Sequence, residues 1–392
     1  MPNNYTLNDA CFITTGKLDS NAVVEGGEYP FYTCAAEPTT IDYYDYDDSV
    51  VLIAGNNAQG NFHVNRFTGK FNAYQRTYIL TKKEGHDLDY VYYALKLELK
   101  RLKEKSQGSQ TKFLTMPILN NIHLGSRNFF EQQKIANILS SLDSKIELNN
   151  KINKELESMA KTLYDYWFVQ FDFPDVNEKP YKSSGGKMVY NQELKRESPE
   201  GWEVCRLDKI EDNIITGKTP PKVNPEYFDG DIPFITIGDI RGNMHISSTE
   251  ETLTKLGADY QNTKYVNKGA LCVSCIASPG LIGFATKLSQ TNQQINSIEC
   301  KKEENSFYLY FALNDFFNAS KAKTGNTFPN MNKGDFADIK LIKPNEQVLL
   351  SFSKKIKSSI EQIYINSEQN QELAKLRDWL LPMLMNGQVK VK

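Results

Sequence analysis

The sequence predicts an α+β protein that is built twice: two similar globular units, each followed by a long helix, with the two helices packed against each other. Three observations predict this. A heptad pattern from about Glu131 to Phe168 recurs from about Glu346 to Met385. Setting Asn149 on Asn366 gives an offset of 366 − 149 = 217 residues. Each pattern also follows a stretch with mixed helix and strand signals, and self-similarity of this kind indicates duplication.

The same offset superposes further seam positions of the two helices: Ile146 on Ile363, Asn153 on Asn370, Leu156 on Leu373 and Leu163 on Leu380. With 392 residues, of which 40% are hydrophobic and 11% aromatic, the chain can build two or three domains that bury real cores. We expect a first domain at 1–128, a first long helix at 129–170, a linker at 171–201, a second domain at 202–344, a second long helix at 345–386 and a tail at 387–392.

Composition restricts the compartment and the partners. No apolar run approaches the ~18 residues of a membrane span, and the start Met1-Pro2-Asn3-Asn4 lacks the regions of a signal peptide. We therefore expect a cytoplasmic protein. The formal net charge is −2, whereas nucleic-acid binders usually carry a basic balance. Any positive surface for a nucleic acid must therefore be local.

The cysteines and histidines predict no metal site. Cys272 and Cys275 form a lone C-x-x-C, and a zinc site would need a second pair of Cys or His at comparable spacing. Both lie in the apolar run from Ala270 to Ile276, which is typical of a buried strand. We expect them to be small core residues.

The two units repeat the same order of short motifs. The first has Ile13-Thr14-Thr15-Gly16-Lys17, then Tyr29-Pro30-Phe31-Tyr32, a strand at Ser49–Ala54 and a polar loop at Gly55–Asn61. The second has Ile214-Ile215-Thr216-Gly217-Lys218, then Ile232-Pro233-Phe234-Ile235, a strand at Gly269–Ile276 and a loop at Ala277–Gly280. Apolar runs separated by polar, glycine-containing segments favour strands joined by loops.

Each unit continues with an aromatic-rich helix, at Tyr90–Leu95 and at Phe307–Leu313, whose rings we expect in the core rather than stacked on bases. A basic, glycine-containing loop follows each helix, at Lys105–Phe113 and at Lys321–Phe328. Lysine and small polar side chains are the groups that contact phosphates and base edges. An ordinary surface loop has the same composition, so both interpretations stay open.

Both heptad seams carry asparagine near mid-length, at adjacent d and a positions: Asn149 and Asn153 in the first helix, Asn366 and Asn370 in the second. Buried asparagine costs stability unless it meets a partner, and it fixes the register of paired helices. An antiparallel pair would set Asn149 against Asn370 and Asn153 against Asn366. A parallel pair would set like against like.

No catalytic constellation is visible. Gly217-Lys218-Thr219 resembles the end of a P-loop, but Asp212 stands where the first glycine should be. The four histidines show no metal-ligand spacing. Acidic residues interleaved with tyrosines, namely Asp42, Asp45, Asp47 and Asp48, are typical of a solvated loop, with a charged patch for a partner as the alternative.

Three segments carry a family resemblance. Lys161-Thr162-Leu163-Tyr164-Asp165-Tyr166-Trp167-Phe168-Val169-Gln170-Phe171 resembles the end of the central helix in specificity subunits of type I restriction-modification enzymes. The link from Pro180 to Tyr190, followed by Pro199-Glu200-Gly201-Trp202, is similar to the stretch that introduces the second target-recognition domain in that family. The tail from Leu376 to Gly387 resembles the end of its C-terminal helix.

This resemblance implies a non-catalytic DNA reader with pseudo-twofold symmetry. Each globular unit would be a target-recognition domain for one half of a bipartite, asymmetric site in double-stranded DNA. The two helices would pack as an antiparallel coiled coil that sets the gap. Methyltransferase subunits, two of them expected, would dock on the helices and bring S-adenosylmethionine, while motor-nuclease subunits would bring ATP and Mg chemistry. Because adenine N6 is unreachable in a stacked duplex, the methyltransferase would flip the base.

Within that implied function, the repeated Thr-Gly-Lys motifs would place Lys17 and Lys218 near phosphates. Asparagine and glutamine can bridge adenine N6 and N7, so the polar loops supply the candidate readers. The DNA-binding candidates of the first unit are Thr15, Lys17, Asn56, Asn57, Gln59, Asn61, Gln110, Thr111 and Lys112. Those of the second are Thr216, Lys218, Thr219, Arg241, Ser278, Lys323, Asn326 and Thr327.

Two competing functions remain. A duplicated DNA-binding adaptor or regulator would use the same plan without a methyltransferase partner. A single-chain restriction enzyme would need a catalytic module, which this sequence lacks. Activity that depends on S-adenosylmethionine and co-purifies with the chain would argue against the adaptor.

Overall fold

The computed structural model describes residues 5–56, 62–105, 114–324 and 330–391. The chain divides into two compact units, one formed by residues 1–147 with 371–392 and the other by residues 148–370. Two long helices, α4 (Phe129–Tyr164) and α10 (Glu346–Met385), each contribute a part to both units. The second helix has the limits that its heptads predict. The first ends as an α-helix four residues early and continues as a π-helical turn, η2 (Asp165–Val169).

The first unit is built on a sheet of six strands in the order β2-β7-β5-β6-β3-β4. Neighbouring strands are antiparallel except β3 and β6, which run parallel, with Phe31 beside Asn72. The elements of this unit before α4 are β1 (Tyr5–Thr6), α1 (Leu7–Ala10), β2 (Cys11–Thr15), η1 (Ser20–Ala22), β3 (Tyr29–Tyr32), β4 (Thr39–Ile41), β5 (Tyr46–Ala54), β6 (Val64–Ala73), β7 (Thr77–Lys82), α2 (Leu88–Lys105), α3 (Met116–Asn120) and β8 (His123–Gly125).

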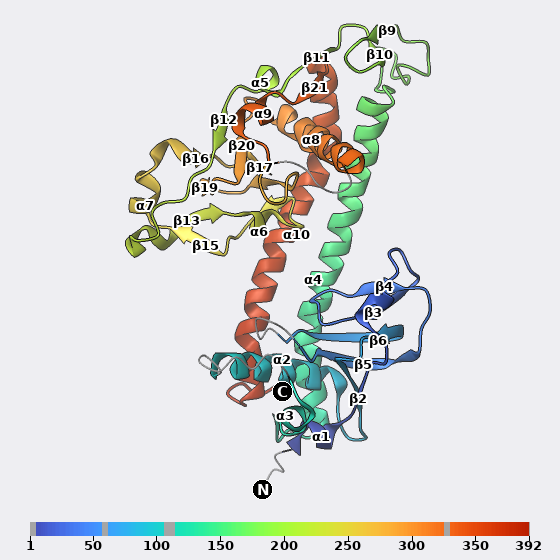
Figure 1. Cartoon of the computed structure of the whole chain (residues 1–392), viewed down its shortest axis with the longest axis vertical. Helices are drawn as coiled ribbons and strands as arrows, with labels where there is room; N and C mark the ends of the chain where they lie inside the picture. The colour runs from blue at the N-terminus through green and yellow to red at the C-terminus, as the bar shows by residue number, and fades with distance from the viewer. Residues whose placement is uncertain (1–4, 57–61, 106–113, 325–329, 392) are drawn as a thin grey trace. The chain divides into compact units, whose positions relative to one another are not determined.

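The aromatic helix α2 packs on β5 and β6 (Figure 1) and closes the core of the first unit. Tyr90 and Tyr93 are fully buried there, so the prediction that these rings belong to the core is confirmed. Leu139 of α4 and Leu384 of α10 belong to the same apolar cluster. The core therefore includes parts of both long helices.

The second unit contains a five-stranded sheet, β12-β20-β17-β18-β14, and a four-stranded sheet, β15-β13-β19-β16. Two further pairs are β9 with β10 and β11 with β21. Its elements are β9 (Met188–Asn191), β10 (Arg196–Pro199), β11 (Glu203–Arg206), α5 (Leu207–Ile210), β12 (Ile214–Thr216), η3 (Pro225–Tyr227), β13 (Phe228–Ile235), α6 (Ile237–Ile240), β14 (His245–Ile246), β15 (Glu251–Leu253), α7 (Lys255–Asp259), η4 (Asn262–Lys264), β16 (Tyr265–Val266), β17 (Leu271–Ser274), β18 (Ile282–Ala285), β19 (Ser289–Thr291), β20 (Ile295–Ile298), α8 (Glu303–Thr324), α9 (Lys333–Ala337) and β21 (Lys340–Lys343).

Aromatic rings dominate the core of the second unit. Phe168 of η2 packs edge-on against Phe352 of α10, with ring centroids 5.0 Å apart. The second aromatic helix, α8, contributes Phe311 to this cluster. Cys272 and Cys275 are buried in the core, as expected. Among the residues described, no group of His, Cys, Asp and Glu is arranged to hold a metal ion.

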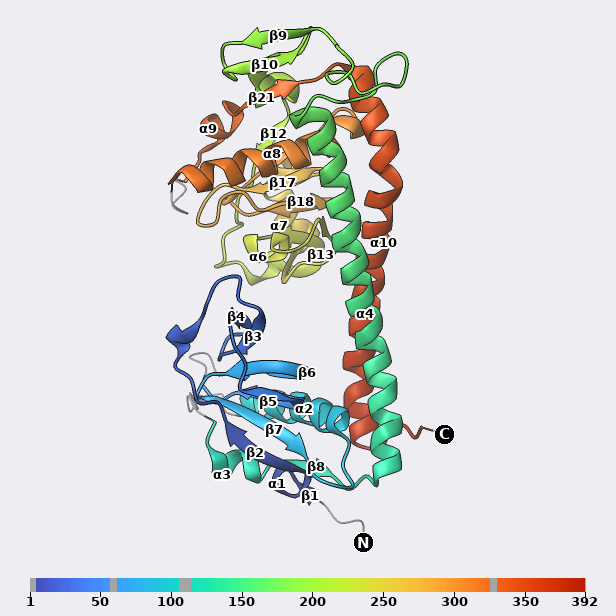
Figure 2. The same ribbon diagram turned by 90° about the vertical axis from the view of Figure 1, so that its right-hand side faces the viewer.

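The asparagine layer fixes the direction of the helix pair. Asn149 Nδ2 donates to Asn370 Oδ1 at 2.8 Å, and Asn366 Nδ2 donates to Asn153 Oδ1 at 2.8 Å. These are the partners that an antiparallel pair predicts, so the antiparallel expectation is confirmed and the parallel alternative is wrong. Figure 2 shows α4 and α10 side by side in opposite directions.

The two units share details that the sequence repeat does not show. The Leu7 N–H donates to the Ile122 carbonyl at 2.8 Å, and the Leu207 N–H donates to the Ile339 carbonyl at 2.8 Å. Strands β13 and β19 run parallel in the second unit, as β3 and β6 do in the first. The duplication therefore extends to tertiary hydrogen bonds. None of the helices within the described ranges could cross a membrane.

Candidate nucleic-acid interface

Three separate segments of the first unit meet at one end of its sheet. The Gly16 N–H, just after β2, donates to the Thr77 carbonyl at 3.0 Å. The Gly55 N–H, just after β5, donates to the Arg76 carbonyl at 2.8 Å. The Leu114 N–H in turn donates to the Gly55 carbonyl at 2.9 Å. Gly55, where the predicted polar loop Gly55–Asn61 begins, and Leu114, directly after the predicted basic loop Lys105–Phe113, are thus brought to the Thr-Gly-Lys motif.

The second unit forms three equivalent hydrogen bonds. The Gly217 N–H donates to the Ile295 carbonyl at 3.1 Å, and the Cys275 N–H donates to the Gln294 carbonyl at 2.8 Å. The Met331 N–H donates to the Cys275 carbonyl at 2.9 Å. Met331 corresponds to Leu114 at the offset already found, 331 − 114 = 217. Two regions with little sequence similarity therefore hold their loops by the same three hydrogen bonds.

Close backbone packing explains why glycine stands in both Thr-Gly-Lys motifs. A Cβ at Gly16 would lie 2.2 Å from the Ala73 carbonyl oxygen, and one at Gly217 would lie 2.2 Å from the Asn292 carbonyl oxygen. Such separations are well inside van der Waals contact, so only glycine fits at either position. The next residues, Lys17 and Lys218, are both exposed. The repeated motif thus serves to seat a strand end and to present a lysine.

The structure brings some of the predicted DNA contacts together. In the first unit, Thr15 and Lys17 are exposed and Asn56 is half-buried at the cluster. In the second unit, Thr216 Oγ1 donates to Asn296 Oδ1 at 2.6 Å, and Thr219 Oγ1 donates to Gln293 Oε1 at 2.7 Å.

Ser278 lies in the same region of the second unit, because the neighbouring Ala277 N–H donates to Asn330 Oδ1 at 3.1 Å. Arg241 is exposed after α6 and takes part in none of the hydrogen bonds that hold this cluster. The remaining candidates lie outside the described residues, or their side chains do: Asn57, Gln59, Asn61, Gln110, Thr111, Lys112, Lys323, Asn326 and Thr327.

The turn at the centre of each cluster is not among the features that the sequence predicts. Gln75 and Arg76 are exposed between β6 and β7. Gln293 and Gln294 occupy the equivalent turn between β19 and β20, and Gln293 is exposed. Arginine and glutamine are side chains that read base edges. The signal that could have identified these residues is the presence of Arg or Gln in a turn between two strand patterns.

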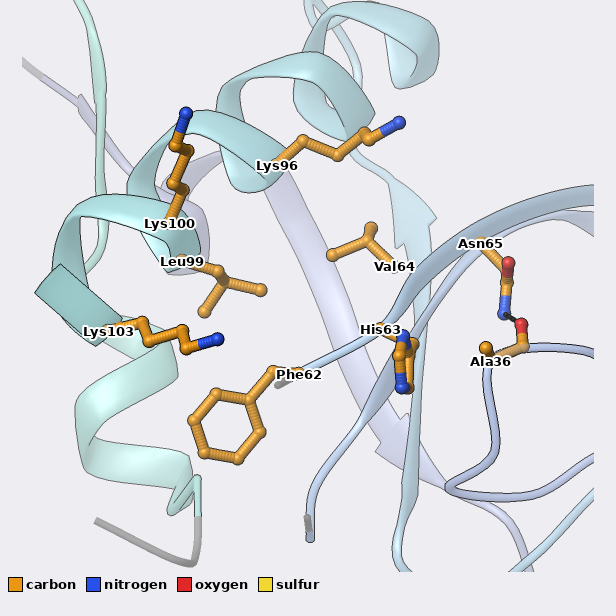
Figure 3. A pocket seen from close by; sticks show the side chains of 9 residues that line it. All are labelled: Ala36, Phe62, His63, Val64, Asn65, Lys96, Leu99, Lys100 and Lys103. Carbon is orange, nitrogen blue, oxygen red and sulfur yellow. Dashed lines mark hydrogen bonds between the residues drawn. The ribbon is translucent and has the colours of Figure 1, made fainter. Parts of the chain in front are cut away.

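The first unit also has a basic groove of about 460 Å³ beside this cluster. Its residues are Ala36, Phe62, His63, Val64, Asn65, Lys96, Leu99, Lys100 and Lys103. The three lysines are spaced four and three residues apart on α2 and therefore share one side of that helix. Figure 3 shows the Lys103 side chain pointing towards Phe62 and His63, while Lys96 and Lys100 extend outward from α2.

The three lysines give this groove a local positive charge on a chain whose formal net charge is −2. In the sequence, Phe62 directly follows the predicted loop Gly55–Asn61, and α2 ends at Lys105, where the predicted loop Lys105–Phe113 begins. The four aspartates from Asp42 to Asp48, by contrast, are all exposed. Asp42 and Asp45 lie in a loop, but Asp47 and Asp48 belong to strand β5, where they pair with Lys70 and Gly69 of β6. The prediction of an acidic loop is therefore wrong for Asp47 and Asp48.

Comparison with known proteins supports one family over most of the chain. Residues 3–158 and 199–376 match the family model described as the type I restriction modification DNA specificity domain. The chain is 33% identical over 328 residues to the type I restriction enzyme HindI specificity subunit of Haemophilus influenzae, spanning 70% of this chain and 71% of that protein. It is 28% identical over 321 residues to the MjaIX specificity subunit of Methanocaldococcus jannaschii, spanning 79% of this chain and 71% of that protein.

The fold also matches a solved structure. The crystal structure of a type I restriction-modification S subunit from M. genitalium superposes with a TM-score of 0.58. The match covers 97% of this chain and 95% of that one at 16% sequence identity. At this identity the match demonstrates a shared fold.

Proposed function

Since this chain belongs to the family of DNA specificity subunits of type I restriction-modification systems, we propose that its two units read the two halves of one split DNA site. The observation that carries this proposal is the repeated cluster of loop ends. The same three hydrogen bonds hold both clusters, while the side chains presented there differ, as in Arg76 against Gln294. A common scaffold with different polar groups suits the reading of two different sequences.

Within each unit we assign phosphate contacts to cations and base contacts to polar tips. Lys17, Lys96 and Lys100 would bind phosphates in the first unit, and Lys218 would do so in the second. Arg76 and Asn56 would reach base edges in the first unit, and Thr219 and Gln293 in the second. The reader residues predicted in the loops Gly55–Asn61, Lys105–Phe113 and Lys321–Phe328 remain part of this proposal.

The long helices supply the second half of the proposed function. On α4, Met159 is 65% exposed, and on α10 its equivalent Leu376 is 42% exposed, with 376 − 159 = 217. Both follow an exposed glutamate by four residues, Glu155 on α4 and Glu372 on α10. We call Glu155, Met159 and Thr162 the α4 stripe, and Glu372, Leu376 and Trp379 the α10 stripe. Spacings of three and four residues place each set on one side of its helix.

Two matching exposed stripes suit two copies of one partner. Large apolar side chains left exposed at repeated positions are typical of protein interaction surfaces. We propose that two methyltransferase subunits dock there and supply S-adenosylmethionine for adenine methylation. Motor-nuclease subunits would add ATP- and Mg-dependent cleavage. The chain itself would be non-catalytic, and the complex would act in the cytoplasm.

The alternative, a DNA-binding adaptor without a methyltransferase partner, gives no role to the stripes. It would share the DNA-reading clusters, so DNA binding alone does not separate the two functions. The dependence of methylation on the chain does separate them.

The deciding experiment is to co-express the chain with its cognate methyltransferase subunit in a host without other adenine methylation. Sequencing that detects modified adenines should reveal one split motif with a fixed gap. Each subunit alone should leave the DNA unmodified. Methylation by the isolated chain, or methylation by the partner at the same motif without the chain, would overturn the proposal.

A further inference from the structure

We infer that the two helix stripes bind the partner unequally, and that the first partner copy is bound at the α10 stripe through Trp379. This inference rests on the proposed docking of methyltransferase subunits. The stripes match at two of their three positions, Glu155 with Glu372 and Met159 with Leu376. They differ at the third, where Thr162 stands against Trp379, with 379 − 162 = 217.

Trp379 offers a large apolar surface to a partner. Its side chain is 57% exposed although it is the bulkiest residue type. Buried indole rings dominate the binding energy of many interfaces, whereas threonine is under-represented among such residues. The Thr162 hydroxyl donates a 2.9 Å hydrogen bond to the Ser158 carbonyl of its own helix, so this donor is already satisfied without a second protein.

The helix beneath Trp379 is firmly anchored in the first unit. Leu381 and Leu384 are buried on the other side of α10, and Arg377 donates to Asp143 Oδ1 at 2.7 Å. A side chain presented from a fixed backbone loses less conformational freedom on binding. Trp379 is therefore preorganised, which strengthens the contribution of its exposed ring.

The α4 helix has no equal substitute at the corresponding place. The nearest exposed ring is Tyr166 of η2, the π-helical turn that continues α4; Tyr166 lies about one turn beyond Thr162 and is 37% exposed. Its equivalent on α10 is Met383, which is half-buried. A partner surface shaped for Trp379 would meet a threonine on α4, with the aromatic group displaced along the helix.

The glutamates define the rest of the partner's chemistry. Within the described part of the chain, neither Glu155 nor Glu372 forms an ion pair. A lysine or arginine on the partner would pair with either glutamate, so the shared charge gives both stripes their common attraction. The partner surface we infer therefore combines a cation with an apolar recess wide enough for an indole ring.

A reciprocal exchange tests this inference. Trp379→Thr makes the α10 stripe match the α4 stripe, and Thr162→Trp makes the α4 stripe match the α10 stripe. Binding of the cognate methyltransferase subunit to the full chain would be measured by isothermal titration calorimetry. Native mass spectrometry would count the bound copies. Val176→Thr is the matched control, because it removes an apolar group that is 99% exposed outside the helices.

The wild-type chain should bind two copies in two steps, with a one-copy complex prominent at equimolar partner. Trp379→Thr should weaken the first step by about tenfold or more and bring the two affinities together. Thr162→Trp should strengthen the weaker step, and Val176→Thr should change neither. Both helix substitutions lie on the surface, and an unchanged thermal melt would show that each variant folds.

Several outcomes would overturn the inference. Two equal wild-type steps would do so, as would a first step that Trp379→Thr leaves unchanged. Self-association of the chain that Trp379→Thr abolishes would identify a second copy of this chain as the occupant instead. None of these results affects the split methylation motif. Absence of any partner binding, together with absence of methylation, would instead contradict the proposed function.

Discussion

The Tyr93 hydroxyl donates a 2.6 Å hydrogen bond to Asp143 Oδ2 and so joins α2 to α4 inside the first unit. Arg377 of α10 donates to the other carboxylate oxygen at 2.7 Å. Burial, together with this carboxylate, raises the pKa of Tyr93 well above its usual range, so the hydroxyl remains a donor. The buried carboxylate of Asp143 thus connects α2 of the first unit to both long helices, α4 and α10.

Replacing Arg377 with alanine should destabilise the first unit, because the largely buried Asp143 side chain would lose its cationic partner. Breaking a fully buried pair costs ~3–5 kcal/mol. The Arg377 side chain is 20% exposed, so we expect about 2 kcal/mol, measured by urea denaturation. Lys187→Ala removes the exposed pair with Glu200 and should cost less than about 1 kcal/mol. Equal losses in the two variants would contradict a special role for Asp143.

The asparagine layer should specify register more than it stabilises. Asn149→Leu alone leaves Asn370 and Gln369 without their donor and should cost about 1–2 kcal/mol. Asn149→Leu combined with Asn370→Leu should recover most of that loss, since the two facing asparagines are both replaced by apolar groups. Gln369 and Asn150, which lose their partners in this variant, are exposed and can hydrogen-bond to water instead.

The combined variant should also lose its single alignment, because a leucine seam accepts more than one register. Double electron–electron resonance between spin labels at the exposed positions 151 and 357 would report the loss of a single register as a broadened distance distribution. A distribution as narrow as that of the wild-type pair would show that other contacts set the register.

Arg76 should help to read the first half-site and leave the second alone. Arg76→Gln should relax or change the first half of the methylated motif, because glutamine prefers adenine whereas arginine prefers guanine. Loss of a bidentate contact costs ~1–3 kcal/mol of discrimination at one base pair. Sequencing of modified adenines would score each position separately. Gln294→Arg provides the mirror experiment, and a change confined to the second half would support independent reading.

Acid should weaken the second unit through His245. Burial, assisted by Lys268, lowers the pKa of His245 from 6.5 to about 4. Its ring lies 5.5 Å from Phe284 and 5.4 Å from Tyr364. The unfolded chain binds a proton at higher pH than the folded chain does. Stability from this group is therefore fully present above pH 6.5 and is lost as the pH falls towards 4.

The loss should reach about 3 kcal/mol, since one pKa unit corresponds to ~1.4 kcal/mol. Urea denaturation between pH 7 and pH 4 would measure it as the difference between the wild-type chain and His245→Gln. Taking this difference removes the contribution to the free energy of unfolding from carboxylates that titrate in the same pH range, because both proteins contain them. His123→Asn changes an exposed histidine and should follow the wild-type curve. Parallel curves for wild type and His245→Gln would rule out this assignment.

The sequence by itself determined the duplication, the two long helices and the partners within their seam. Heptads and strand alternation are periodic over a few residues, so they can be read along the chain. The pairing of Asn149 with Asn370 also followed, because two matching seams with a polar layer leave only two directions to choose between.

Only the tertiary structure decided which loops meet at each candidate interface. The bond from Gly16 to Thr77 joins residues 77 − 16 = 61 positions apart, and no periodic pattern records such a contact. Arg76 was missed for this reason, since a lone turn residue gains its role from the two segments folded against it. The lysines of α2 form a groove only because Phe62 and His63 fold opposite them. Local patterns fix elements, whereas burial and backbone hydrogen bonds between distant segments fix where their side chains converge.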